Sequence, residues 1–311
     1  MSKNRGIKMK KISRTNDLAF KKAFTSEGNA ESIIGLAKDV LGLDIKEILF
    51  KQPYSIESYI KLVNENKLAA FQQTIKDISA NIILDNRNAN FVSELQVRES
   101  KNFYERSLFY PFETYVDNYK DGKYGSLKPI YSINIIGYPM FMEDLDGLRI
   151  FEMWDRYHAK GFPIECKVGY FEYKKTNFFT DNQGYWRDYF LDKEISDNAP
   201  EYIKRAAEIV DYANLEKEEK EMVDLLEKFE ADRNAREEWV KDEATKEGFE
   251  VGVKEGKIVG IKEGIKEGIK EGIKEGIKGM IKFNIPLENI ASIYNMTVAQ
   301  VNELLIDSSH S

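Results

Sequence analysis

Two polar side chains, two residues apart on an alternating stretch, are the first candidates for chemistry. Residues 77–96, DISANIILDNRNANFVSELQ, alternate apolar and polar positions in two arms, which predicts a β-hairpin. Successive strand side chains point to opposite faces, so Glu94 and Gln96 share a face. Asp77, at the start of the first arm, places a second carboxylate on the neighbouring strand. The polar run at 85–90 predicts the turn.

Carboxylates on regular strands have two interpretations. In the first, they form the solvated face of a half-exposed hairpin. In the second, Asp77 and Glu94 hold a hard cation such as Mg²⁺, which prefers oxygen ligands and takes one or two protein carboxylates. Gln96 would then orient a water molecule beside the cation. The spacing alone leaves both interpretations open.

Several segments, in order along residues 14–195, together resemble one known family. Asp77, a hairpin and Glu94-x-Gln96 resemble the core of the PD-(D/E)XK nuclease superfamily, with Gln96 where most members have Lys. Other segments resemble the recombination-promoting nuclease (Rpn) and transposase branch of that superfamily. They are NDLAFKKAF at 16–24, FYERSLFYPFETYVDNY at 103–119, KPIYSINIIGYPMF at 128–141 and FEYKK at 171–175.

The resemblance implies an α/β fold, a PD-(D/E)XK restriction-endonuclease-like core whose mixed central sheet is flanked by helices. The composition after about residue 200 adds an extended helical C-terminal region. The resemblance further implies a metal-dependent DNA endonuclease, a hydrolase of phosphodiester bonds. Mg²⁺ or Mn²⁺ would be held by Asp77 and Glu94, with the carbonyl of Leu95 as a further ligand, and Gln96 would position the water. Gln96 is uncharged, so it does not stabilise a developing anion as a Lys would. The resemblance also makes Asp17 a secondary catalytic candidate; otherwise Asp17 is a first-turn helix stabiliser.

Basic residues near the hairpin are candidates for DNA contacts. The formal net charge is −7, so no global basic field attracts nucleic acid and binding must depend on a local surface. Arg98 and Lys101 are expected to bind substrate. Arg106, which shares a helix side with Tyr110, is a third candidate for substrate binding and has two interpretations. In one it reaches solvent beside a core-flanking tyrosine; in the other it lies against the scissile phosphate or beside Glu94, where a guanidinium suits phosphate geometry. The full candidate set is Lys21, Lys22, Arg87, Arg98, Lys101 and Arg106.

Cysteine content and hydropathy predict the compartment. The single cysteine, Cys166, excludes an internal disulfide and a Cys-cluster zinc site, which is typical of a reducing cytosol. No apolar run approaches membrane-spanning length, and the first residues lack the apolar stretch of a signal peptide. We therefore expect a cytoplasmic protein without a membrane partner.

The other helices and strands of the core are predicted from hydrophobic periodicity and from the residues that typically begin and end helices. Helices are expected from Asp17, with Thr15 as N-cap, over 29–41 and over 101–119, and strands over 130–136, 148–154 and 164–173. Pro111 predicts a kink or break in the third helix. Lys160-Gly161 predicts the turn between the last two strands.

Composition divides the chain into five segments. They are a disordered N-terminus at 1–13, a nuclease-like domain at 14–199, a charged helical region at 200–247, a Gly-Ile-Lys-Glu repeat at 248–279 and a small helical hairpin at 280–311. The narrow apolar stripe of the charged region predicts an extended amphipathic helix or a short coiled coil.

Glycine recurs every fourth residue from Gly248 to Gly276. Each glycine costs about 0.8–1 kcal/mol relative to alanine, so an isolated helix is marginal here. In the favoured interpretation the glycine row admits a second helix and the chain forms a homo-oligomer. In the other, the repeat is a semi-flexible charged spacer. The tail is expected to be a packing or oligomerisation hairpin, since its second helix, VAQVNELL, has no Lys or Arg to read DNA.

The alternative function belongs to a different class. A nuclease-fold protein with weak or no catalysis would act as an oligomerising interaction module. The acidic net charge and the long repeat region favour this alternative. The presence of Asp77, Glu94 and Gln96 together favours the nuclease.

Overall fold

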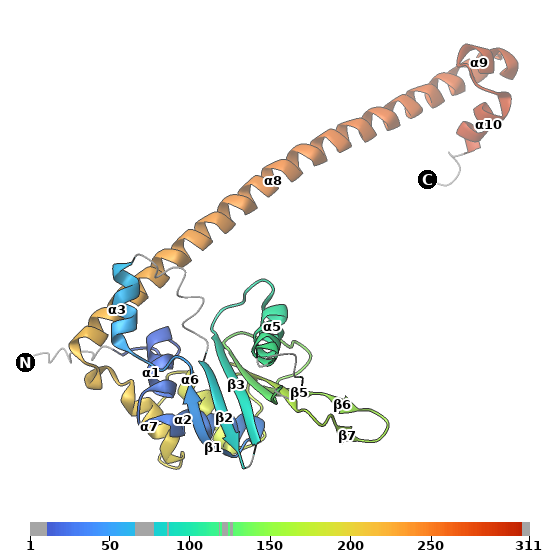
Figure 1. Ribbon diagram of the computed structural model, residues 1–311. Helices are drawn as coiled ribbons and strands as arrows, with labels where there is room; N and C mark the ends of the chain where they lie inside the picture. Colours follow the sequence, from blue (N-terminus) through green and yellow to red (C-terminus); the bar gives the residue numbers. More distant parts are fainter. Residues whose placement is uncertain are drawn as a thin grey trace, which may run out of the picture. The chain divides into compact units, whose positions relative to one another are not determined.

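A computed structural model describes residues 11–65, 78–85, 87–117, 119, 124 and 127–306 (Figure 1). The chain divides into two compact units, Met1–Phe229 and Glu230–Ser311. The predicted metal ligand Asp77, most of the N-terminal segment predicted to be disordered, and Asn86 of the hairpin turn lie outside the described residues. Among the described helices, none is both long and apolar enough to cross a membrane.

A six-stranded mixed sheet forms the centre of the first unit, in the order β1-β2-β3-β4-β8-β5. The strands are β1 (Ile45–Phe50), β2 (Ile78–Leu84), β3 (Arg87–Gln96), β4 (Ile130–Ile136), β5 (Leu148–Glu152) and β8 (Cys166–Glu172). β3, β4 and β8 run parallel, whereas β1, β2 and β5 pair antiparallel with their neighbours. Every residue of β4 is buried, as predicted for a central strand covered on both faces.

The predicted hairpin is formed by β2 and β3. Ile78 pairs with Ser93 and Leu84 pairs with Arg87, so the connection is much tighter than the predicted polar turn at 85–90. β3 begins at Arg87, and Asp85 turns the chain with a φ of 45°. The polar residues that suggested a long turn instead lie on the first part of β3, because strand pairing satisfies their backbone groups.

Helices cover the two faces of the sheet unequally. α1 (Asp17–Thr25), α2 (Ala30–Leu41), α6 (Asp181–Phe190) and α7 (Glu201–Ile209) share one core cluster with the face that carries Leu95 and Phe171. Phe24 and Trp186 lie in this core with ring centroids 5.7 Å apart. α5 (Phe103–Val116) lies on the opposite face, where Phe103, Ile136 and Tyr170 form a smaller cluster. The face with the smaller cluster is the one that carries Glu94.

The ends of the first two helices follow local sequence signals. The N-cap of α1 is Asn16, whose side chain accepts from the backbone N–H of Leu18 at 3.0 Å, so the predicted Thr15 cap is wrong by one residue. α2 ends as predicted at Gly42, which adopts a φ of 69° that glycine reaches without steric cost. α3 (Ile56–Asn64) follows β1.

α5 continues through Pro111, so the predicted break does not occur. Pro111 is buried, and one turn earlier the Ser107 hydroxyl shares a hydrogen bond of 2.8 Å with the Tyr170 hydroxyl. This tertiary anchoring offsets the backbone bond that proline cannot donate. The outward side of the helix is apolar, with exposed Tyr104, Leu108, Phe109, Phe112 and Val116.

β5 and β8 form the predicted strand pair, but their connection differs from the prediction. Lys160–Gly161 is itself a short strand, β7, paired with β6 (Trp154–Asp155), and the turn falls between them at residues 156–159. Figure 1 shows this two-stranded arm extending beyond the main sheet. Ala159, with a φ of 49°, takes the turn conformation that the glycine was expected to take.

The charged region after residue 200 is not one helix. α7 is followed by a 3₁₀ turn, η2 (Tyr212–Asn214), and then by α8 (Lys217–Lys282). Ile203 and Ala206 of α7 and Val223 of α8 are buried in the main core. The folded core thus continues past residue 199, and the predicted domain limits stay a prediction.

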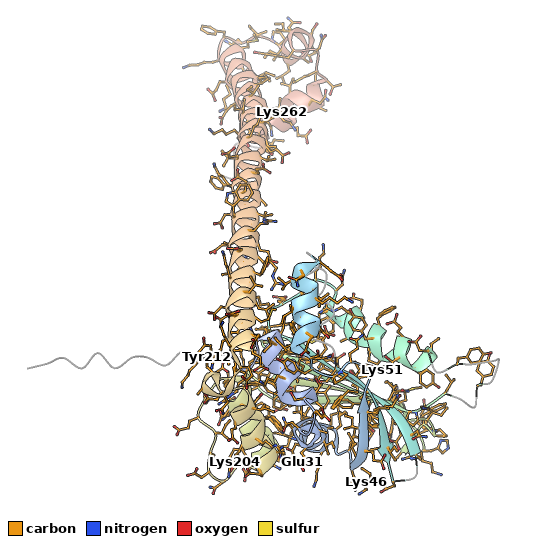
Figure 2. All side chains as sticks on the ribbon, turned by 60° about the vertical axis from the view of Figure 1, so that its left-hand side comes forward. Glu31, Lys46, Lys51, Lys204, Tyr212 and Lys262 are labelled. Atoms are coloured by element: carbon orange, nitrogen blue, oxygen red, sulfur yellow. The ribbon has the colours of Figure 1, made fainter. Side chains whose placement is uncertain are left out.

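In the second unit, the end of α8 packs with α9 (Leu287–Ile293) and α10 (Val298–Ile306) around Ile277, Ile290 and Val301. The Thr297 hydroxyl accepts from the N–H of Gln300 at 3.2 Å and so caps the last helix. A Cβ on Gly276 would lie 2.2 Å from the Tyr294 hydroxyl, so any larger residue would force the Tyr294 side chain to shift. Among the described residues, none lies within 4 Å of a Cβ built on the repeat glycines 248–272. Figure 2 shows side chains around Lys262 projecting outward from α8.

Candidate active site

Glu94 and Gln96 lie near the C-terminal end of β3, on the face covered by α5. Their strand neighbours are Asn134 and Ile136 of β4, in parallel register. Glu94 is 5% exposed, while Gln96 is partly exposed at the strand end. A carboxylate this deeply buried requires compensation by a cation or by hydrogen bonds.

Arg106, in the first turn of α5, supplies that compensation. Its Nε and Nη2 donate to Glu94 Oε1 at 3.1 and 2.7 Å, and Nη2 also donates to Gln96 Oε1 at 2.5 Å. The guanidinium carbon lies 5.3 Å from the centre of the Phe103 ring. Asn102, with a φ of 64°, turns the chain into α5 so that Arg106 faces β3. Arg106 therefore lies beside Glu94, as one of its interpretations expected, while its contact with substrate stays a prediction.

The Gln96 amide is held at both ends. Its oxygen accepts from Arg106, and its nitrogen donates to the carbonyl oxygen of Arg98 at 2.6 Å. Each end keeps further hydrogen-bonding capacity, because an amide has two N–H donors and its oxygen has two lone pairs. The amide is thus oriented beside Glu94 and still able to bond a water molecule.

The connection between β3 and α5 carries the other predicted substrate contacts. Arg98 and Lys101 are both exposed there, next to the site. Nearby, burial raises the pKa of Tyr138 to about 12, and the charge of Glu99 adds to this increase while Arg106 opposes it. The positive guanidinium thus acts electrostatically on the loop after β4 as well as on Glu94.

The six predicted basic residues do not form one surface. Lys21 is buried, and the half-buried Lys22 is engaged in an ion pair with Glu219 at 2.5 Å, so neither offers a free charge to DNA. Arg87 pairs with Glu165 at 3.3 Å, at the opposite end of β3 from Glu94. Tertiary contacts with residues far along the chain, invisible to local sequence patterns, cause this difference.

Asp17 lies in the first turn of α1, which packs on the sheet face opposite to Glu94. Burial raises the pKa of Tyr59, and the charge of Asp17 contributes to this increase. Thr15 bonds Tyr173, the residue that follows β8, so the start of α1 lies at the edge where the parallel strands end. Asp17 is thus near the same edge as Gln96, on the other side of the sheet.

Asp77 lies outside the described residues, so its side chain cannot be placed. Its neighbour in sequence, Ile78, is the first described residue of β2 and pairs with Ser93. Ser93 in turn precedes Glu94. Among the described residues, His, Cys, Asp and Glu side chains form no group of three that could hold a metal.

A second buried carboxylate, missed from the sequence, lies on the same face of the sheet. Glu172 of β8 is aligned with Gln96 through Ile136 of β4. Its Oε1 accepts from the backbone N–H groups of Met140 and Phe141 at 2.6 and 3.2 Å. An acid ending the buried run VGYFE is the sequence signal that could have identified it.

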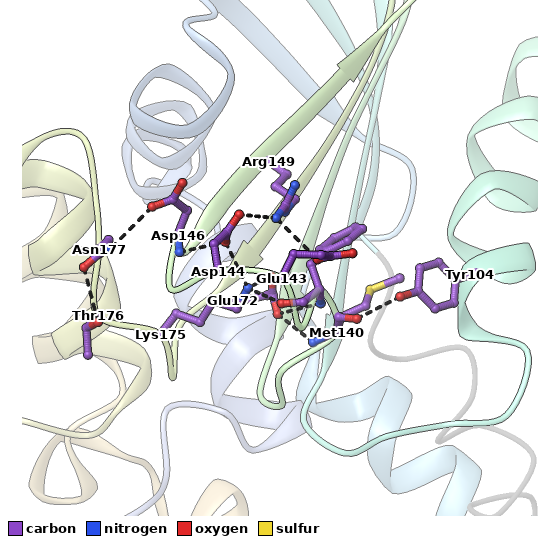
Figure 3. A network of polar contacts seen from close by, with 11 residues as sticks. Tyr104, Met140, Glu143, Asp144, Asp146, Arg149, Glu172, Lys175, Thr176 and Asn177 are labelled. Carbon is purple, nitrogen blue, oxygen red and sulfur yellow. Dashed lines mark hydrogen bonds and ion pairs between the residues drawn. The ribbon is translucent and has the colours of Figure 1, made fainter.

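Figure 3 shows how this carboxylate fastens the loop after β4. Lys175 pairs with Glu172 at 3.0 Å and donates to the carbonyl of Phe141 at 2.5 Å. The Tyr104 hydroxyl of α5 donates to the carbonyl of Met140 at 2.8 Å. The loop therefore links the end of β8 to the turn of α5 that carries Arg106.

The fold and this buried acid-amide pair on a central strand define a nuclease-like α/β protein. A family model described as PD-(D/E)XK nuclease family transposase matches residues 14–238, and the chain belongs to this family. The family expected from the resemblance of the sequence is confirmed. No curated protein and no solved structure matches the chain.

Proposed function

We propose that this protein is a metal-dependent DNA endonuclease of the recombination-promoting, transposase-type branch, acting in the cytoplasm. The observation that supports this most strongly is the buried Glu94 carboxylate, oriented beside Gln96 on a central strand of a chain in a nuclease family. A structural carboxylate would not need an aligned amide next to it.

The donor set near Glu94 suits a hard divalent cation, Mg²⁺ or Mn²⁺. Carboxylate and carbonyl oxygens are the ligands such ions prefer. Glu94, the backbone carbonyl of Leu95 and Asp77 would hold the ion, and Asp17 is a secondary candidate. The place of Asp77 in this set follows from its sequence position beside Ile78, whose partner adjoins Glu94. When bound, such an ion polarises the phosphodiester and favours ionisation of water.

The protein's own residues have separate roles in this proposal. Gln96 orients the attacking water through its amide, which is held in place by its bond to the carbonyl oxygen of Arg98. Arg106 supplies the positive charge that a Gln in place of Lys cannot supply, and a guanidinium matches phosphate geometry. The exposed Arg98 and Lys101 contact the DNA backbone as it enters the site.

A second candidate function is an oligomerising interaction module with weak or absent catalysis. The exposed Ile261, Ile265 and Ile269 on α8 favour it, because apolar side chains repeated along a helix are usually covered by a partner. The repeat glycines with open space around them would admit a helix of a second copy. Self-association through α8 is compatible with the nuclease as well.

The test is cleavage of supercoiled plasmid DNA in Mg²⁺ or Mn²⁺ by wild type, Glu94→Gln and Glu99→Gln. Glu99 is an exposed acid five residues away and serves as the matched control. We expect nicking by wild type and Glu99→Gln, none by Glu94→Gln, and none in EDTA. Equal activity in all three proteins would reject the site. Folded wild-type protein without activity would favour the interaction module.

A further inference from the structure

Arg106 and the proposed metal ion require the same carboxylate. Two guanidinium N–H groups bond Glu94 Oε1, at 3.1 and 2.7 Å. Glu94 is buried, so little water screens a second positive charge placed there. A divalent cation on Glu94 would therefore be repelled by the neighbouring guanidinium, whose unit charge interacts with twice the charge of a monovalent ion.

The structure gives Arg106 freedom to leave. Its side chain is 32% exposed, whereas that of Glu94 is 6% exposed. Besides bonding Glu94 and Gln96, the guanidinium lies over the face of the Phe103 ring, a contact that a long flexible side chain can leave at small cost. The cation on the helix is thus the movable partner, and the carboxylate on the central strand is the fixed one.

Release of Arg106 would also change Gln96. The same Nη2 that bonds Glu94 donates to the Gln96 amide oxygen at 2.5 Å. Removing it frees an acceptor on the group that we assign to the attacking water. A single movement of Arg106 therefore frees the Glu94 carboxylate for the metal ion and the Gln96 amide oxygen for the attacking water.

We propose that Arg106 is a counter-ion gate, which occupies Glu94 and Gln96 until a divalent cation displaces it and directs the guanidinium toward the DNA phosphate. This inference rests on the proposed function, since it needs the metal site at Glu94. It assigns to Arg106 a regulatory role in metal binding, beyond its contact with substrate.

The first experiment measures Mn²⁺ binding to the full-length chain by calorimetry, without DNA. Arg106→Gln should bind Mn²⁺ about tenfold more tightly than wild type, the order expected from removing a unit charge beside a divalent ion. Lys101→Gln removes an exposed charge from the same segment and should change the affinity little. Arg106→Gln should nevertheless cleave DNA more slowly than wild type.

The outcomes separate this inference from the proposed function. Unchanged or weaker Mn²⁺ binding by Arg106→Gln, with wild-type binding that Glu94→Gln abolishes, overturns the gate and leaves the metal site standing. Absence of Mn²⁺ binding to folded wild-type protein overturns both.

A second measurement uses the wild-type protein, so its result does not depend on whether Arg106→Gln folds. In ¹⁵N-labelled wild-type protein, the Arg106 Nε–H signal, assigned by its absence in Arg106→Lys, should exchange slowly without Mg²⁺. Saturating Mg²⁺ should make it exchange rapidly, because the bond to Glu94 is lost. A slowly exchanging signal at saturating Mg²⁺ would show that the guanidinium stays on Glu94 and would overturn the gate.

Discussion

Arg106 of α5 donates through both Nε and Nη2 to one oxygen of Glu94 on β3. This pair joins the helix to the strand at the point where the parallel strands end, and Nη2 extends the contact to Gln96. The buried acid is compensated by a group that lies on a different element and is itself partly exposed. The predictions below follow from this pair and from the contacts that hold it.

Replacing Gln96 by leucine removes the oriented amide and keeps the Glu94–Arg106 pair. We expect the rate of metal-dependent DNA cleavage to fall by about 10²-fold, the lower end of the effect of losing a positioned proton-transfer or water-orienting group. Mn²⁺ affinity should change little in comparison. Single-turnover cleavage and calorimetry on the same samples measure the two quantities. A parallel loss of affinity would instead make Gln96 a metal ligand.

Glu172 and Lys175 form a buried ion pair that fastens the loop after β4. Glu172→Gln removes the nearer carboxylate from Lys175 and leaves it only Asp144 at 3.7 Å, so the free energy of unfolding should fall by about 3 kcal/mol. Tyr104→Phe removes one hydrogen bond to Met140 and should cost about 1 kcal/mol. Urea unfolding measures both, and Tyr157→Phe, an exposed tyrosine, is the control. A larger loss in Tyr104→Phe than in Glu172→Gln would contradict this ranking.

Glu219 should make stability depend on acidity. Burial, the largest influence, raises its pKa, but hydrogen bonds from Lys22 and Tyr54 outweigh it and the net pKa is lowered. The ordinary pKa of this carboxyl is 4.5. Because its pKa is lower in the folded state, the ionised carboxyl stabilises the protein at pH values above 4.5. This contribution is lost as the pH falls below 4.5 and through the lowered pKa.

Glu219→Gln removes this contribution and leaves the ammonium group of Lys22 without its carboxylate partner. At pH 7 the variant should lose about 3 kcal/mol of the free energy of unfolding. Between pH 5 and pH 3 its stability should fall less steeply than that of wild type, because this interval covers the ordinary pKa of 4.5 and the lower range in which the folded-state carboxyl takes up its proton. Thermal melts of both proteins across this pH interval measure the two slopes of stability against pH. Identical slopes for the two proteins would mean that the Lys22–Glu219 pair contributes nothing.

Substitution by alanine should have opposite effects on stability at two glycines of the repeat. Gly264→Ala meets open space and should stabilise α8 by about 0.8–1 kcal/mol. Gly276→Ala should loosen the packing of α9, because its Cβ would collide with the Tyr294 hydroxyl. Circular dichroism melts test both. If Gly264→Ala raises helicity but also dissociates an oligomer, the glycine row is the contact between copies.

Local patterns predicted the site residues that belong to one strand. The period of two placed Glu94 and Gln96 on one face, and the apolar run identified β4 to the residue. Contacts between segments far apart in the chain escaped prediction: Lys22 pairs with Glu219, and Glu172 accepts from the backbone N–H of Met140. Pro111 failed as a helix breaker for the same reason, since packing on the sheet outweighs local preference.

The central claim is that Glu94 and Asp77 form one metal-dependent cleavage site. The most direct test compares single-turnover DNA cleavage by wild type, Asp77→Asn, Glu94→Gln and the double variant, in Mg²⁺. Residues that act as one unit are non-additive, so both single variants and the double variant should fall to the same background. Wild-type cleavage by Asp77→Asn, or independent losses that multiply in the double variant, would contradict the account.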